Sequence, residues 1–214
     1  MAAMISRGSL IAFEGCDRSG KTTQVMKLVE KLNKEGKVTK MIKFPVRNTN
    51  VGKIINSYLN CDKELDDHTV HLLFSANRWE MKQEITTNLE MGVNVIVDRY
   101  AHSGVAYTAA KPGFNMSWCK NSDTGLPKPD MVCFLNVSEE IARQRPNFGE
   151  EKYEIEAFQR EVKKKFLEMF DSDWVEILAD EPIDEVHKKI YKIVSSEIEK
   201  ENKGKLKELW VDEE

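Results

Sequence analysis

Phosphate chemistry is indicated by one octapeptide, Gly15-Cys16-Asp17-Arg18-Ser19-Gly20-Lys21-Thr22. It fits the pattern G-x-x-x-x-G-K-S/T, whose glycines allow successive backbone N–H groups to close around an anion. Lys21 supplies a point charge for the β- and γ-phosphates of a nucleoside triphosphate, and Thr22 offers a hydroxyl ligand to Mg²⁺. The motif therefore predicts binding of a nucleoside triphosphate with Mg²⁺. The alternative is a glycine-rich turn that merely caps a helix.

The residues on either side place this loop between a strand and a helix. Residues 10–13 are apolar and predict a buried strand. Within residues 24–34, one helical face carries the apolar side chains of Val25, Leu28, Val29 and Leu32. A tight turn between strand and helix presents N–H groups at the positive end of the helix dipole, which favours a phosphate site over a purely structural turn.

Strand and helix patterns alternate along the rest of the chain. Further strands are predicted at residues 38–44, 93–97, 131–137 and 174–178, and helices at residues 20–35, 65–90, 153–170 and 183–201. This alternation predicts an α/β fold with a five-stranded parallel sheet covered by helices on both faces. The sequence shows no repeat and no interdomain linker, so we expect one domain spanning residues 1–214.

Composition narrows the possible partners. The net charge is −4, so no global basic field exists to hold nucleic acid, although a local basic cleft for substrate phosphates is compatible with it. The longest apolar runs are too short to cross a bilayer, and the first residues lack the apolar core of a secretory signal. The four cysteines are scattered without metal-ligand spacing, which favours a reducing compartment. We therefore expect no nucleic-acid partner and no membrane association.

Arginine residues gather where the predicted strands end. In an open parallel sheet, ligands bind beyond the carboxyl ends of the strands. Arg47 follows the second strand, Asp98 and Arg99 follow the third, and Arg143 and Arg145 lie after the fourth. One crevice is thus lined with guanidinium groups, which favours a site for two phosphorylated ligands over a site for one.

Asp98 and Arg99 directly follow the apolar run at residues 93–97. A carboxylate at this position can reach the Mg²⁺ held by Thr22, and Arg99 offers a two-pronged contact to phosphate. The alternative is that Asp98 caps the next helix and pairs with Arg99.

Phe74 and Arg78 are four residues apart on a predicted helix and so share a face. A flat ring for stacking beside a guanidinium donor suits a nucleobase with a carbonyl edge. Spacing alone favours the alternative of a core Phe with a solvated Arg, because such pairs are common on amphipathic helices.

The segment at residues 143–149 is polar and contains Pro146 and Gly149, as expected of a mobile flap that closes over phosphate. Its arginines could then stabilise charge on the transferred group, as arginine fingers do. The alternative is a solvent-exposed basic loop.

Two charged residues inside the phosphate loop need separate explanations. Asp17 is repelled by phosphate, so we expect its side chain to face a sugar hydroxyl instead, whereas Arg18 reaches towards the far phosphate. No metal or general-base role is assigned to the histidines His68, His71, His102 and His187, because they form no cluster in the sequence.

Taken in order, the motifs resemble those of the thymidylate kinase family. They are the phosphate loop at 15–22, Phe44-Pro45-x-Arg47, and residues 73–80, 98–106, 125–130 and 208–210. The likeness runs through nearly the whole chain and is closest to the eukaryotic and poxviral type. It implies a three-layer P-loop NTPase fold with a small lid at about residues 143–152.

The resemblance implies the reaction ATP + dTMP → ADP + dTDP, in the synthesis of dTTP, with ATP and Mg²⁺ as cofactors. It also implies a cytoplasmic homodimer with one site in each subunit, and entry into the nucleus is left open. Acceptance of dUMP or related deoxynucleoside monophosphates is compatible with it.

The residue roles implied by the resemblance fall into four groups. The catalytic group is Arg18, Lys21, Asp98, Arg99 and Arg145. The ATP group is Arg18, Ser19, Gly20, Lys21, Thr22, Thr23 and Arg145. The dTMP group is Asp17, Phe44, Arg47, Phe74, Arg78, Arg99, Ser103, Gly104, Tyr107 and Tyr153, and the Mg²⁺ group is Thr22 and Asp98.

Within the dTMP group, the resemblance assigns the deoxyribose 3′-hydroxyl to Asp17 and the substrate phosphate to Arg47 and Arg99. Phe74 stacks on thymine, and Arg78 donates to its carbonyl. The rings of Tyr107 and Tyr153 border the sugar and help to exclude ribose.

Some positions depart from the family pattern. Val46 stands where Glu is expected, His102 where Phe is usual, and Pro146 and Asn147 replace small residues in the flap.

Two other functions remain open at this point: a kinase for another nucleoside or nucleotide, and a switch that hydrolyses ATP or GTP. A switch should lack a second nucleotide pocket.

Overall fold

The computed structural model describes residues 7–145, 151–200 and 203–211. Within these residues, five parallel strands form one sheet in the order β2-β3-β1-β4-β5. The strands are β1 (Leu10–Glu14), β2 (Thr39–Lys43), β3 (Asn94–Asp98), β4 (Met131–Asn136) and β5 (Trp174–Leu178). The predicted fold class and parallel sheet are confirmed, and the predicted strands differ from these only at their ends.

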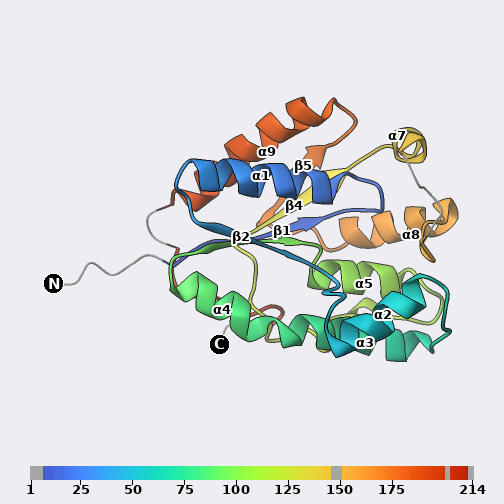
Figure 1. Ribbon diagram of the computed structural model, residues 1–214. Helices are drawn as coiled ribbons and strands as arrows, with labels where there is room; N and C mark the ends of the chain where they lie inside the picture. Colours follow the sequence, from blue (N-terminus) through green and yellow to red (C-terminus); the bar gives the residue numbers. More distant parts are fainter. Residues whose placement is uncertain (1–6, 146–150, 201–202, 212–214) are drawn as a thin grey trace.

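Helices cover both faces of the sheet and give three layers (Figure 1). One face carries α1 (Lys21–Lys34) and α9 (Ile183–Ile198). The other face carries α4 (Lys82–Glu90), α5 (Ala101–Ala109) and α8 (Glu156–Leu167). The remaining described helices are α2 (Asn50–Leu59), α3 (Asp67–Glu80), α6 (Met116–Asn121) and α7 (Glu139–Gln144).

The central strand β1 shows how the sequence builds two cores. Leu10 and Ala12 pack into the cluster beneath α4, α5 and α8, whereas Ile11 and Phe13 pack into the cluster beneath α1 and α9. All four side chains are fully buried. Alternate residues of a strand point to opposite faces, so a strand between two helix layers must be apolar on both sides.

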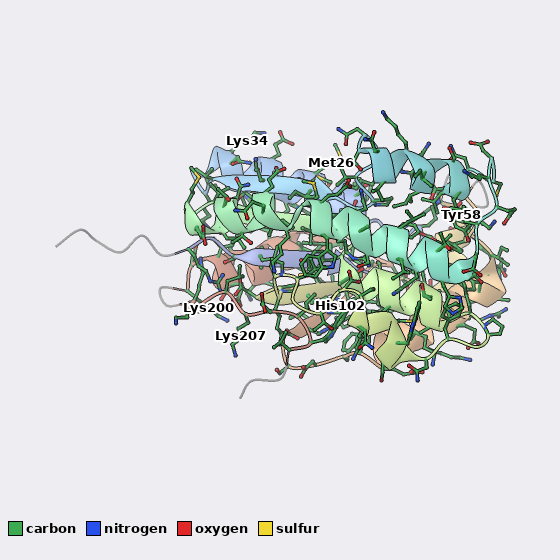
Figure 2. All side chains as sticks on the ribbon, turned by 90° about the horizontal axis from the view of Figure 1, so that it is seen from below. Met26, Lys34, Tyr58, His102, Lys200 and Lys207 are labelled. Carbon is green, nitrogen blue, oxygen red and sulfur yellow. The ribbon has the colours of Figure 1, made fainter. Side chains whose placement is uncertain are left out.

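The prediction of one continuous helix over residues 65–90 is wrong. The segment contains two helices, α3 and α4, separated at Met81, whose N–H bonds to Arg78 O three residues earlier. The first of them begins after Asp66, whose carboxylate accepts from the N–H groups of His68 and Thr69. Figure 2 shows the two helices following each other across this side of the molecule. No proline or glycine stands at the break, so the sequence carries no local signal that would end the helix there.

Within the described residues, four helices lie outside the ranges predicted as helical: α2, α5, α6 and α7. Among these, α5 is buried on nearly all sides, so its sequence lacks the polar face that marks an amphipathic helix. Its position matters for the site because it starts directly after Asp98 and Arg99.

The last described residues return to the body of the protein. Leu209 is buried, and its N–H donates to Leu126 O, as expected from its apolar character near the C-terminal end of the chain. None of the helices in the described part of the chain is long and apolar enough to cross a membrane.

Candidate active site

A cavity of about 640 Å³ lies beyond the carboxyl ends of the central strands. It is lined by every residue to which the family resemblance gave a role: Asp17, Arg18, Ser19, Gly20, Lys21, Thr22, Thr23, Phe44, Arg47, Phe74, Arg78, Asp98, Arg99, Ser103, Gly104, Tyr107, Arg145 and Tyr153. The structure thus gathers residues from six segments of the chain into one volume. The roles given to them remain predictions.

The phosphate loop has the backbone that its glycines predict. Gly15 and Gly20 have φ angles of 143° and 89°, in a region that other residues avoid. A Cβ on Gly15 would lie 2.6 Å from Leu135 O of β4, so a larger residue does not fit. The first turn of α1 has no acidic residue and no side-chain cap. Its N–H groups are therefore available to an anion, which they attract.

Lys21 is almost fully buried within the loop. Its Nζ donates to Cys16 O at 2.7 Å, to Ser19 Oγ at 3.0 Å and to Gly15 O at 3.1 Å. Burial, reinforced by the nearby charge of Arg99, lowers the pKa of the Lys21 ammonium to about 8. An incoming phosphate would favour the charged ammonium and raise that pKa again.

Thr22 and Asp98 meet across the sheet edge. Thr22 Oγ1 donates to Asp98 Oδ2 at 2.5 Å, and Asp98 is buried at the end of β3. A hydroxyl and a carboxylate oxygen side by side are the ligands that Mg²⁺ prefers, so these residues fit the ion. The alternative role of Asp98 as a helix cap is wrong, because Tyr100 is the N-cap residue of α5.

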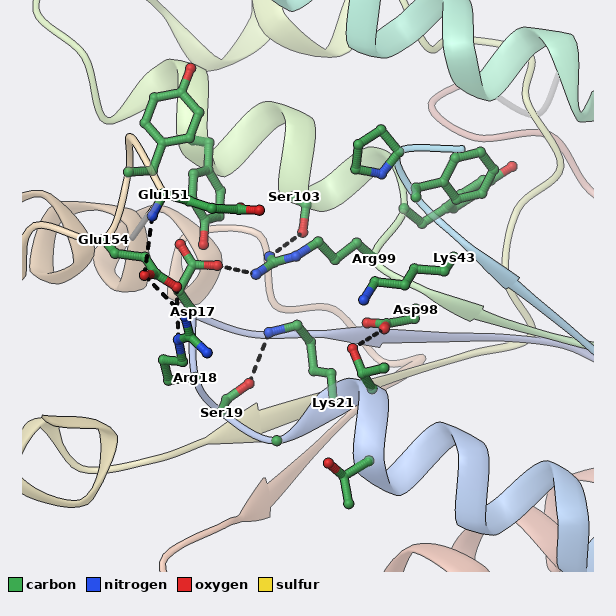
Figure 3. Close-up of a pocket in the computed structure, with 18 of the residues that line it drawn as sticks. Asp17, Arg18, Ser19, Lys21, Lys43, Asp98, Arg99, Ser103, Glu151 and Glu154 are labelled. Atoms are coloured by element: carbon green, nitrogen blue, oxygen red, sulfur yellow. Dashed lines mark hydrogen bonds and ion pairs between the residues drawn. The ribbon is translucent and has the colours of Figure 1, made fainter. Parts of the chain in front are cut away.

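Arg99 joins the loop to the opposite wall of the cavity (Figure 3). Its guanidinium forms an ion pair with Asp17 and donates to Ser103 Oγ at 3.3 Å. The other oxygen of Asp17 accepts from Gln159 Nε2 at 2.7 Å. Arg99 therefore pairs with Asp17, and the alternative pairing with Asp98 is not observed. A sugar hydroxyl at Asp17 would share a carboxylate that already holds Arg99.

Glu14, at the end of β1, was not selected from the sequence. It is fully buried and accepts from the N–H of Tyr100 at 2.9 Å, the N–H of Ser103 at 3.0 Å and the Ser103 hydroxyl. It thus caps α5 from a different element, since no side chain of α5 itself does so. Burial raises the pKa of the Glu14 carboxyl, and the bonds from Ser103 oppose that rise.

Arg78 is buried, which contradicts the alternative of a solvated arginine on an amphipathic helix. Its side chain is 3% exposed, and it bonds through Nε and Nη2 to Asp123, which is 0% exposed. Phe74, one turn earlier on α3, is half-buried and lines the same cavity. A ring and a guanidinium therefore share this wall, as their spacing predicted.

The tyrosines form a separate wall. The guanidinium of Arg99 lies over the Tyr107 ring at 5.3 Å, and the Tyr107 and Tyr153 rings meet edge to face at 5.6 Å. Tyr153 also shares a hydrogen bond of 3.0 Å with the hydroxyl of Tyr58. Ring positions fixed in this way can limit the space beside a bound sugar.

The predicted flap is only partly described, because residues 146–150 lie outside the described residues. Arg145 donates to Arg18 O of the phosphate loop and, at 3.0 Å, to Ala179 O; its predicted role towards ATP stays a prediction. Arg143 is more than half exposed, pairs with Glu156 and does not line the cavity. The crevice is thus lined by Arg145 but not by Arg143.

Two glutamates beyond the flap contact arginines that were assigned to phosphate. Glu154 accepts from Arg18 Nε at 2.8 Å and Nη2 at 3.2 Å, and Glu151 accepts from Arg47 Nη2 at 2.6 Å. All four of these residues line the cavity. A bound phosphate at Arg47 would therefore compete with Glu151.

The residues that sequence reasoning missed are Glu14, Lys43, Asp123, Glu151, Glu154 and Gln159. Glu14 and Lys43 end β1 and β2, so the rule that ligands bind at strand ends could have found them. In Figure 3, the amine of Lys43 extends towards Asp98. The others lie in loops or on α8, and no local pattern connects them to the site.

A phosphate loop at the carboxyl edge of a parallel sheet, facing arginines across one cavity, defines a P-loop kinase fold. The chain belongs to the thymidylate kinase family, whose model matches residues 13–190. It is therefore related to phosphate-transferring enzymes, and the resemblance predicted from its motifs is confirmed.

Individual relatives agree over most of the chain. The thymidylate kinases of Danio rerio and Homo sapiens are 48% and 44% identical to it, each over 95% of this chain and 98% of the relative. The solved structure of thymidylate kinase from Candida albicans superposes with a TM-score of 0.81 at 40% identity. That match covers 89% of this chain and 92% of the other.

Proposed function

We propose that this protein transfers the γ-phosphoryl group of ATP to dTMP, giving ADP and dTDP, in the synthesis of dTTP. The observation that carries the proposal is that the loop with Lys21 and the wall with Phe74 and Arg78 line one cavity. The family membership supports dTMP as the acceptor.

The donor half neutralises charge. The N–H groups of the phosphate loop and Lys21 bind the phosphates of ATP, and Arg18 and Arg145 approach the transferred group. Mg²⁺, held by Thr22 and Asp98, would neutralise charge on the phosphate oxygens. Ser19, Gly20 and Thr23 complete this half, which keeps the transferred group fixed while the bond to ADP breaks.

The acceptor half orients dTMP. Its phosphate oxygen is already an anion, so the attack needs positioning and no strong general base. Arg47 and Arg99 bind that phosphate, and Arg47 leaves its ion pair with Glu151 to do so.

The base and the sugar occupy the remaining walls. Phe74 stacks on thymine, and Arg78 donates to a carbonyl oxygen of the base. Tyr107 and Tyr153 border the sugar, and Asp17 bonds its 3′-hydroxyl. Phe44, Ser103 and Gly104 complete this part of the site.

A methyl group alone separates dTMP from dUMP. One methyl in an apolar pocket changes kcat/KM by roughly 10- to 200-fold. We therefore expect dUMP to be a poorer but measurable acceptor. The Candida albicans enzyme is described as having broad substrate specificity, which supports this expectation. The cytoplasmic homodimer stays a prediction from the resemblance.

The test is ATP consumption and dTDP formation with a panel of nucleoside monophosphates, with and without Mg²⁺. We expect Mg²⁺-dependent dTDP formation, with dTMP preferred over dCMP, dAMP and the ribose form of TMP. ATP loss at the same rate without any acceptor would instead indicate a hydrolase or switch.

A further inference from the structure

The guanidinium of Arg78 is fixed by a carboxylate from another part of the chain. Asp123 Oδ1 accepts from Nε at 3.0 Å, and Asp123 Oδ2 accepts from Nη2 at 2.5 Å. Both side chains are buried. Two parallel bonds define the plane of the guanidinium as well as its position, and Nη1 takes no part in the fork.

The segment that carries Asp123 is itself attached to α3, the helix of Arg78. The neighbouring carbonyl, Ser122 O, accepts from Ser75 Oγ at 2.7 Å and from Trp79 Nε1 at 2.8 Å. The Ser122 hydroxyl lies 3.1 Å from His71 Nε2. These contacts fix the position of the Asp123 carboxylate along α3. The carboxylate therefore cannot follow the Arg78 side chain if that side chain moves.

The backbone of α5 confines the guanidinium from another side. A Cβ on Gly104 would lie 2.6 Å from Nη2 of Arg78 and 3.0 Å from Nη1. Any larger residue would displace the arginine, so the absence of a side chain at Gly104 is what allows this position. Arg78 and Gly104 also line the cavity that Phe74 faces.

We propose that Asp123 is a specificity-determining residue, which acts by holding Arg78 in the orientation that presents N–H donors to the base. This inference rests on the proposed function. An arginine has donors and no acceptor, so its fixed edge favours a base with a carbonyl at that edge. A base with an amino group there, as in cytosine, meets a donor with a donor. Without Asp123, the guanidinium can rotate away and this discrimination weakens.

The test compares kcat/KM for dTMP and dCMP in the wild type and in Asp123→Asn, which keeps the size and removes the charge. The expected result is a fall in the dTMP-to-dCMP ratio of roughly 10- to 100-fold, the equivalent of losing a hydrogen bond to a charged group. The fall should come from a higher KM for dTMP, with kcat less affected.

A matched control is Asp130→Asn. Asp130 forms a similar two-pronged pair, with Arg7 at 2.9 and 2.6 Å, but it does not line the cavity. This variant should have a lower free energy of unfolding and an unchanged dTMP-to-dCMP ratio of kcat/KM. If Asp123→Asn does not fold, the variant to measure is Gly104→Ala, because its methyl group displaces the Arg78 guanidinium without removing a charge. The same fall in the dTMP-to-dCMP ratio of kcat/KM is expected for it.

Three results would overturn the inference. The first is an unchanged dTMP-to-dCMP ratio of kcat/KM in folded Asp123→Asn, or in Gly104→Ala if Asp123→Asn does not fold. Asp123 would then have a purely structural role. The second is an equal fall in Asp130→Asn, which would assign the effect to general destabilisation. The third is a wild type that phosphorylates none of the monophosphates, which alone would also overturn the proposed function.

Discussion

The two halves of the cavity are built in different ways. The donor half is largely one continuous segment, in which Lys21 bonds to atoms of Gly15, Cys16 and Ser19 within the same octapeptide. The acceptor half is assembled from side chains on separate elements: Arg47, Phe74, Arg78, Arg99, Tyr107 and Tyr153. Ion pairs hold the three arginines of this set: Arg47 with Glu151, Arg78 with Asp123, and Arg99 with Asp17 of the phosphate loop.

The difference separates chemistry from selectivity. A local loop can provide the charge that phosphate transfer needs, because backbone N–H groups and one lysine suffice. Recognition of a particular base needs side chains from several directions, and these must be supported by buried partners. We therefore expect substitutions in the donor half to lower turnover, and substitutions in the acceptor half to change affinity, selectivity and stability.

The largest effect is expected where the acceptor half depends on a buried charge. Asp123→Asn should lower the free energy of unfolding by about 3–5 kcal/mol, because it leaves Arg78 buried without its carboxylate. Glu151→Gln breaks the exposed pair with Arg47 and should cost less than about 1 kcal/mol. Denaturant unfolding of both variants checks this. Equal losses would mean that burial does not distinguish the two pairs.

The next effect concerns the donor half. Lys21→Ala should lower kcat by roughly 100- to 1,000-fold, as for the loss of one preorganised donor to developing charge. The dissociation constant for dTMP should change little, because Lys21 lies on the phosphate loop. Arg18→Ala should follow the same pattern.

Steady-state kinetics combined with dTMP binding measures both quantities. Lys27→Ala serves as a control, since Lys27 lies on the same helix and pairs with Asp184 at an exposed position. Parallel losses of turnover and dTMP affinity in Lys21→Ala would count against the division between the halves.

A smaller effect is expected at the base. Phe74→Ala should weaken dTMP binding by roughly 1–3 kcal/mol if the ring stacks on thymine. ATP affinity should be unchanged, because the ring belongs to the acceptor half. Calorimetric titration with each nucleotide is the measurement, and an unaltered dTMP dissociation constant in the folded variant would remove Phe74 from the site.

The smallest expected effect is the uptake of protons by Lys21, in the donor half, when ATP binds. The pKa of Lys21 is lowered from 10.5 to about 8. Between these values the unfolded chain binds more protons than the folded protein, so Lys21 makes the free energy of unfolding rise with pH in that window. Phosphate favours the charged ammonium, so ATP binding at about pH 8.5 should take up a fraction of a proton.

The measurement is the enthalpy of ATP binding in two buffers with different ionisation enthalpies. Lys21→Arg should abolish the buffer dependence that Lys21 causes, because an arginine stays protonated. The same enthalpy in both buffers for the wild type would contradict the link between Lys21 and phosphate.

The same contrast explains what could be predicted from the sequence. The phosphate loop is local, so its eight residues, the strand before it and the helix after it were all predicted. The strand-end rule then led to Arg47, Asp98 and Arg99. The alternative for Arg78, a solvated side chain, was favoured by spacing because the deciding partner, Asp123, is 45 residues away.

The missed parts share a physical reason. Glu14 caps α5 from 86 residues away, and Gln159 supports Asp17 from 142 residues away, so no local pattern contains either contact. The break at Met81 is marked by neither proline nor glycine, and α5 has no polar face that would reveal it as a helix. Supporting contacts of this kind are tertiary and become visible only in the folded chain.

The most direct test of two halves with separate tasks is a binding experiment with both nucleotides present. dTMP is titrated into the protein alone and into protein saturated with a non-hydrolysable ATP analogue and Mg²⁺. We predict one dTMP per chain in both cases, with the analogue still bound. Competition between dTMP and the analogue for a single site would contradict the account.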